Sequence, residues 1–254
     1  MEFELKSDGN DQVEKRRILL WIAYCASHLG DHQRALDAYD DIQHVDEMPE
    51  ISLFKAACMY YLQQYDEAMQ EAAEGPVGPL QNRILFHCAL KMGDEDKLLI
   101  YHQKLTDSKE DQLSLAAIHY LRNHYQEATD VFKRLLLENR DDIALNIYVA
   151  MCYYRLDYYD VSLEIMQAYL QAFPDSSVAI NVKACNQFKL YNGSAAKDEL
   201  RALTDKGYNL SDNDIISHNV VVFDDGKNAL RVLPLLVDSL PEARLNLVRN
   251  KHYL

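Results

Sequence analysis

Residues 143–176 read IALNIYVAMCYYRLDYYDVSLEIMQAYLQAFPDS, which is two apolar stretches joined by a short polar turn. In each stretch small and apolar residues recur every three or four positions, the spacing of one face of a helix. Pro174 ends the second stretch, because proline cannot continue a helix. The sequence therefore predicts an antiparallel pair of helices as the building unit of the fold.

The same unit recurs seven times along the chain. We call the small or apolar residue that opens each second helix the anchor. The anchors, spaced by 30 to 34 residues, are Ala35, Ala68, Leu98, Ala128, Ser162, Ala196 and Ala229. A helical repeat of this length is the signature of tetratricopeptide repeats. We therefore predict an all-α fold, a right-handed superhelical solenoid of antiparallel helix pairs.

The repeats divide the chain into three parts. Residues 1–15 are predicted to be the remnant of a preceding helix and a linker. Residues 16–241 hold about seven tetratricopeptide repeats, and residues 242–254 are predicted to be the truncated first helix of an eighth repeat. Each repeat in such an array packs only on its neighbours.

Composition limits the classes of partner. The chain of 254 residues is 48% hydrophobic and has no apolar run as long as the roughly 18 residues of a membrane span. No signal peptide opens it, so we expect a soluble intracellular protein without membrane insertion. The formal net charge of −14 disfavours nucleic acid and favours basic or mixed-charge protein segments, although acidity alone also supports solubility.

Motifs of catalysis are absent from the sequence. It holds no glycine-rich phosphate loop, no G-x-S-x-G and no H-E-x-x-H, and we predict a non-enzyme with no catalytic residue, cofactor, metal or small-molecule substrate. His28 and His32 are four residues apart, but Gly30 ends the helix between them, which favours a solvated turn over a zinc pair.

The cysteines share one position in the repeat, ten or eleven residues before an anchor. This recurring position predicts buried structural thiols between helices and a reducing compartment. They are Cys25, Cys58, Cys88, Cys152 and Cys185.

An aromatic column is the best candidate for a binding surface. Eight residues before four of the anchors stand Tyr60, Tyr120, Tyr154 and Phe188, and Arg155 and Lys189 follow two of them. In a solenoid these first-helix positions line the concave side, where tyrosine offers apolar area and a polar tip to a peptide. The alternative is that the column packs between successive first helices. We predict a protein-binding groove at these six residues.

Several longer strings go beyond the general repeat pattern. They are LWIAYCASHLGD (20–31), EDQLSLAAIHY (110–120), YVAMCYYRLDYYDVS (148–162), KACNQFKLYNG (183–193) and PEARLNLV (241–248). Together they resemble the intraflagellar transport protein 56 family, the tetratricopeptide-repeat subunit of the intraflagellar transport B complex. The resemblance runs from about residue 16 to residue 248.

This resemblance implies a non-catalytic scaffold or adaptor. It would bind other intraflagellar transport B subunits and ciliary cargo proteins, support transport of motility-related proteins into cilia, and support cilium assembly. It would act at the cilium or flagellum, the basal body and the cytoplasm. Members of the family are much longer, so we expect a fragment, a short splice form or an incomplete gene model, truncated at both ends.

Two alternatives stay open. One is a general tetratricopeptide peptide-binding adaptor outside cilia, which localisation would distinguish. The other is a regulatory subunit of an enzyme, or an enzyme itself, which would need a convergent polar pocket with perturbed ionisable groups.

Overall fold

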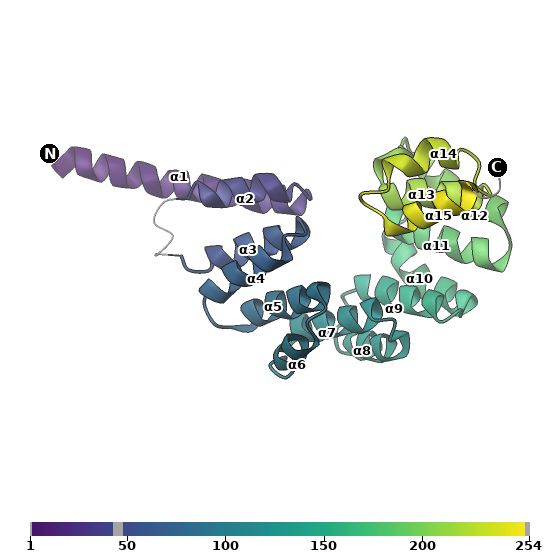
Figure 1. Ribbon diagram of the computed structural model, residues 1–254, viewed down its shortest axis with the longest axis horizontal. Coiled ribbons are helices and arrows are strands. Elements are labelled where there is room, and N and C mark those ends of the chain that lie inside the picture. The colour runs from purple at the N-terminus through teal and green to yellow at the C-terminus, as the bar shows by residue number, and fades with distance from the viewer. Residues whose placement is uncertain (1, 43–47, 252–254) are drawn as a thin grey trace. The chain divides into compact units, whose positions relative to one another are not determined.

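The computed structural model describes residues 2–42 and 48–251, and within them it is entirely helical, with no β-strand (Figure 1). Short turns connect the two helices of a pair into a hairpin, as between α3 and α4 or between α9 and α10. In chain order the helices are α1 (Glu2–His28), α2 (His32–Asp40), α3 (Ile51–Tyr61), α4 (Tyr65–Glu74), α5 (Pro79–Met92), α6 (Glu95–His102), α7 (Lys109–Leu121), α8 (Tyr125–Glu138), α9 (Ala144–Arg155), α10 (Tyr159–Ala172), α11 (Ser177–Leu190), α12 (Gly193–Thr204), α13 (Asp214–Phe223), α14 (Ala229–Val232) and α15 (Pro241–Lys251). The predicted all-α fold is confirmed.

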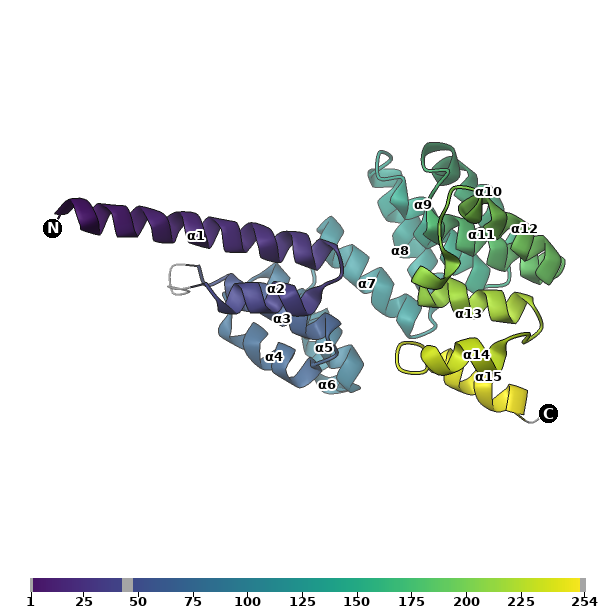
Figure 2. The same cartoon turned by 90° about the horizontal axis from the view of Figure 1, so that it is seen from above.

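The chain forms two compact units, residues 1–118 and residues 119–254. In the first, α1 runs without a break from Glu2 to His28 and lies beside α2, as both views show (Figures 1 and 2). Residues 2–15 thus belong to the same helix as the residues that follow them. The division of the chain into repeats and flanking remnants stays a prediction.

The anchors lie where helices approach most closely. Ala35, Ala68, Ala128, Ser162 and Ala196 are all 0% exposed, and the larger Leu98 is 6% exposed. A small side chain lets two helix backbones come close, and the neighbouring larger side chains fill the space around it. This explains why one small residue recurs once in each helix pair.

The hairpin turns share a backbone conformation as well. Five residues before its anchor, the chain adopts a positive φ at Gly30, Gln63, Gly93, Asn123 and Asp157. Only glycine takes this left-handed conformation without strain, and asparagine and aspartate tolerate it best among the rest. The reversal is therefore imposed by the helix pair even where the sequence supplies glutamine.

Polar side chains tie successive helix pairs together inside the core. In the first unit the buried carboxylate of Asp111 on α7 accepts hydrogen bonds from Arg83 of α5 and from Thr106 in the preceding loop. In the second unit the anchor Ser162 donates to the Ala150 carbonyl and accepts from the buried amide of Asn186. These bonds connect three helices, α9, α10 and α11.

The cysteine prediction is confirmed for three thiols and wrong for one. Cys58, Cys88 and Cys152 are buried, and burial raises the pKa of each thiol to about 11. Cys185 is half-buried. Cys25 is exposed, because no described helix packs on its side of α1, although it occupies the same repeat position.

Candidate protein-binding surface

The predicted column of tyrosines forms a series of aromatic pairs at the hairpin turns. Each tyrosine that ends a first helix packs on the tyrosine five residues later that begins the second. Ring centroids are 5.5 Å apart for Tyr60 and Tyr65, 5.3 Å for Tyr120 and Tyr125, and 5.7 Å for Tyr154 and Tyr159. The positive-φ residue between the partners folds the chain back and brings the rings together.

Burial marks the inner ring of each pair. Burial is the main reason why the pKa of Tyr60 is raised to about 12, and it is also the main reason why the pKa values of Tyr120 and Tyr154 are raised. All three rings are half-buried, so each packs against neighbouring helices and also leaves an edge accessible. The column therefore packs partly between helices, and its role as a protein-binding groove stays a prediction.

Arg155 stands at the outer side of these pairs in the second unit. Its guanidinium carbon lies 4.8 Å from the ring centroid of Tyr125, and it also contacts the Tyr125 hydroxyl. A longer contact of 3.5 Å joins its Nη2 to the side-chain oxygen of Asn123. A cation over a tyrosine face is attracted by the ring quadrupole. Arg155 therefore connects the turn between α9 and α10 to the turn between α7 and α8.

The remaining two predicted residues, Phe188 and Lys189, differ in burial. Phe188 is half-buried, and its ring lies 5.2 Å from that of Phe223, within the apolar cluster formed by α11, α12 and α13. Lys189 is exposed. Tyr60 belongs to the first unit, and the other five predicted residues belong to the second, where Tyr120, Tyr154 and Arg155 form one neighbourhood.

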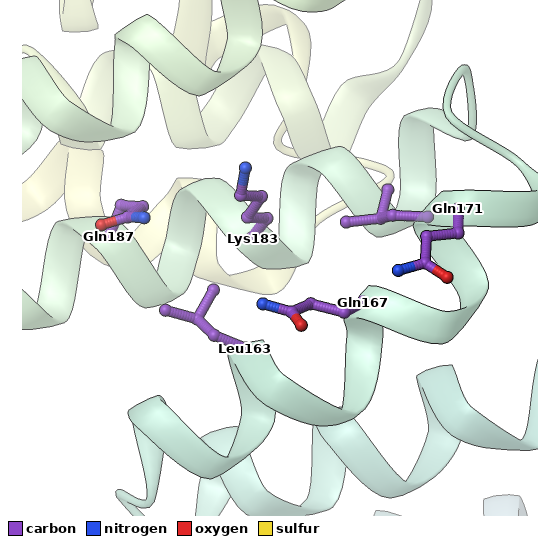
Figure 3. Close-up of a pocket in the computed structure, with 6 residues that line it drawn as sticks. Leu163, Gln167, Gln171, Lys183 and Gln187 are labelled. Carbon is purple, nitrogen blue, oxygen red and sulfur yellow. The ribbon is translucent and has the colours of Figure 1, made fainter.

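Sequence reasoning missed a groove between α10 and α11. It has a volume of about 370 Å³ and is lined by two leucines and four polar side chains (Figure 3). These are Leu163, Gln167, Leu170, Gln171, Lys183 and Gln187. The available signal was spacing, because Gln167 and Gln171 on α10, and Lys183 and Gln187 on α11, are each four residues apart and share a helix face.

Electrostatics in this groove are set by a carboxylate on α12. Glu199 accepts an ion-pair contact from Lys183 at 2.8 Å and a hydrogen bond from Gln187 at 3.3 Å. Carboxamides both donate and accept, so the groove offers hydrogen bonds of the kind that a peptide backbone needs. It offers no nucleophile beside a base, as nucleophilic catalysis would require.

The histidine pair differs from the expected solvated turn. His28 Nδ1 lies 2.9 Å from the Tyr24 carbonyl oxygen, whereas the half-buried ring of His32 stacks on Tyr61 at 4.4 Å between centroids. Within the described residues no group of three or more His, Cys, Asp and Glu side chains is placed to hold a metal ion. No described helix is both long and apolar enough to cross a membrane.

Comparison with known families decides which one this chain resembles. The family model described as intraflagellar transport protein 56 matches residues 19–254. The chain belongs to the intraflagellar transport protein 56 family. The match begins within α1 and takes in both compact units, so family membership rests on almost the whole chain.

The curated relatives of the chain include a protein named for this family. The chain is 33% identical over 267 aligned residues to the intraflagellar transport protein 56 homolog of Caenorhabditis elegans, covering 98% of this chain and 46% of that protein. It is 25% identical over 150 residues to the tetratricopeptide repeat protein 30 homolog of Caenorhabditis briggsae, covering 57% of this chain and 23% of that protein. The chain thus spans about half the length of the first relative and less of the second.

A solved structure supports the fold. The crystal structure of a tetratricopeptide repeat protein from Parabacteroides merdae matches with a TM-score of 0.57 at 16% identity, covering 81% of this chain and 82% of that one. At this identity the likeness concerns the fold alone, and it confirms the tetratricopeptide architecture predicted from the repeat.

Proposed function

We propose that this chain is a non-catalytic scaffold or adaptor of the intraflagellar transport B complex. The observation that carries the proposal is the family match over residues 19–254. In this proposal the chain binds other B subunits and ciliary cargo proteins, supports delivery of motility-related proteins into cilia, and contributes to cilium assembly. Its proposed sites of action are the cilium or flagellum, the basal body and the cytoplasm.

The fold suits such a role. A series of helix pairs presents a large area of side chains, and repeat proteins use such extended surfaces for binding. The groove between α10 and α11 is lined by carboxamides and leucines rather than by paired acids and bases. Protein binding therefore fits the chemistry of the surface better than turnover of a substrate.

Within this role we propose that Tyr120, Tyr154 and Arg155 form part of a partner-binding surface in the second unit. Tyrosine and arginine are enriched among the residues that dominate interface energies, because both give large contact areas with polar ends. Arg155 is held against Tyr125, so less conformational entropy remains to be lost when a partner binds. Phe188 and Lys189 are further candidates in the second unit, and Tyr60 is a separate candidate in the first unit.

A pull-down from extract of ciliated cells, read by mass spectrometry, tests both statements. We expect this chain to enrich intraflagellar transport B subunits, and we expect Arg155→Glu to enrich them less. Arg140→Glu is the matched control, because Arg140 is also exposed and lies in a turn away from the tyrosine pairs.

The outcomes separate the two proposals. If the chain enriches no B subunit while a longer family member does, the scaffold function does not reside in these residues. If the chain and Arg155→Glu enrich B subunits equally, the scaffold function stands and the binding surface lies elsewhere.

A further inference from the structure

Helix α1 carries a second apolar face that its own hairpin does not use. One face packs into the core through Ala23 and Ala26, with Leu19 and Leu20 beside them. A second set of apolar side chains remains exposed at spacings of 3, 4, 7 and 11 residues, which places them on one stripe of the helix. They are Ile18, Trp21, Ile22 and Cys25 on α1, and Leu29 in the turn directly after it.

The exposed stripe is also hollowed. It lines a groove of about 460 Å³ together with Ala26, Arg17 of α1, and Asp31 and Arg34 at the start of α2. Trp21 is 62% exposed and Leu29 is 82% exposed, which is unusual for two large apolar side chains on one surface. Trp21 is held edge-on against Tyr24, with ring centroids 5.8 Å apart.

A helix that is apolar on two faces is normally covered on both. The stripe is about 16 Å long, since eleven residues of helix rise by about 1.5 Å each. The backbone N–H and C=O groups along α1 are already hydrogen-bonded within the helix. The stripe therefore offers no free backbone groups with which a β-strand of a partner could pair. A long, narrow apolar stripe with a hollow suits the apolar face of another helix, the helix-in-groove mode of recognition.

Charge then indicates which helix fits. Arg17 and Arg34 flank the stripe, and the lining also contains Asp31, whose carboxylate accepts a hydrogen bond from the backbone N–H of Arg34. Arg17 makes an exposed contact to Glu14 three residues earlier. Exposed pairs of this kind contribute little, so both guanidinium groups remain able to bind carboxylates of a partner. A second copy that presented the same stripe would bring its own Arg17 and Arg34 toward these two arginines, and this repulsion between like charges opposes self-association.

We propose that the groove on α1 binds an amphipathic helix of another protein, with leucine-type side chains on one face and acidic side chains flanking them. The proposal rests on the proposed function only in that the partner is a protein. Titration with a peptide measures the groove directly and does not depend on assembly with transport subunits, so the failure of one proposal is distinguishable from the failure of the other.

The protein contains a single tryptophan, Trp21, and it lies in the groove. Its emission therefore reports binding without a label. The probe is a synthetic helical peptide with Leu at positions i, i+3, i+4, i+7 and i+11 and Glu on both sides of that face, titrated into the 254-residue chain. We expect a saturable blue shift, and about fivefold weaker binding for the same peptide with Lys in place of Glu.

Two variants locate the site. Leu29→Asp should weaken binding at least tenfold, because it removes a large apolar contact and adds a charge that repels the glutamates. Leu137→Asp, a matched change at a 70% exposed leucine on α8, should bind as the unmodified chain does. Arg34→Glu should reverse the preference between the two peptides.

Three results would overturn the proposal. The first is no blue shift at millimolar peptide, and the second is equal affinity for the Glu, Lys and sequence-scrambled peptides. The third is sedimentation showing that the chain alone forms a dimer that Leu29→Asp dissociates, because the occupant would then be a second copy.

Discussion

The carboxylate of Asp111, 1% exposed, lies 2.8 Å from Nη1 of Arg83, and this pair joins α7 to α5 within the first unit. The second carboxylate oxygen accepts from the backbone N–H and the hydroxyl of Thr106, at 2.9 and 2.8 Å. Burial opposes the negative charge, but these hydrogen bonds outweigh it and hold the pKa of Asp111 below its ordinary value. The pair thus fixes one helix pair on the next.

Replacing Arg83 by glutamine should lower the free energy of unfolding by about 3 kcal/mol at pH 7, because a buried charge loses its partner. Urea denaturation followed by circular dichroism measures this loss. Arg201→Gln is the control, since Arg201 pairs with Asp198 at an exposed site and should change stability by less than about 0.5 kcal/mol. Equal effects of the two substitutions would contradict the role of the buried pair.

The same variant should change the dependence of stability on pH. A depressed folded-state pKa contributes stability above the unfolded pKa of about 4, and that contribution is lost as pH falls through the folded pKa. In Arg83→Gln the pKa of Asp111 rises, so the variant lacks at neutral pH the part of the free energy of unfolding that the lowered pKa of Asp111 contributes. The deficit relative to the unmodified chain should be full at pH 7 and shrink below about pH 4, and urea titrations across pH test this.

Gly193 should tolerate no side chain. A Cβ on Gly193 would overlap the backbone carbonyl of Phe223, where the start of α12 meets the end of α13. We expect Gly193→Ala to cost about 3 kcal/mol, because backbone must shift. Gly78→Ala is the matched control, since a Cβ there meets nothing within 4 Å. Thermal unfolding of both variants would show whether the close approach is real.

Gln63 offers a route to greater stability. It occupies a left-handed turn conformation with φ of 64°, which a glycine adopts without strain. Gln63→Gly should raise the free energy of unfolding by about 0.5–1 kcal/mol. By contrast, Gln70→Gly in the middle of α4 should lower it by about 1 kcal/mol. A loss of stability in both variants would show that the turn is not strained.

Ser162 and Asn186 should be energetically coupled. Both side chains are 0% exposed, and the Asn186 amide nitrogen lies 3.1 Å from the Ser162 hydroxyl. Ser162→Ala should cost about 1–2 kcal/mol, because it leaves the Ala150 carbonyl and the Asn186 amide short of a partner. Combining it with Asn186→Leu should cost less than the sum of the single changes, and a double-mutant cycle from chemical denaturation measures the difference.

The sequence predicted the repeat because its signal is local. The anchors are small where helices touch, and all seven proved to be buried, with exposures from 0% to 6%. The tyrosine column was also visible in the sequence, since it recurs eight residues before the anchors. Its pairing with tyrosines five residues later could have been predicted from the turn length.

Other features depend on residues distant in the chain. Cys25 has the same repeat position as the buried Cys58, yet it is exposed, because burial depends on whether a neighbouring helix covers that face. Nothing local marks Asp111 as buried, since its partner Arg83 lies 28 residues earlier. The groove between α10 and α11 likewise exists only because two helices bring separate glutamines together.

By itself the sequence determined the helices, their pairing and the family, because these follow from periodicity, turn residues and long matching strings within one stretch of chain. Only the tertiary structure decided which side chains are buried, which charges are paired and which apolar face of α1 stays exposed. The physical reason is that burial and electrostatic pairing are properties of contacts between segments, and a linear pattern specifies the face of a helix but not what lies against it.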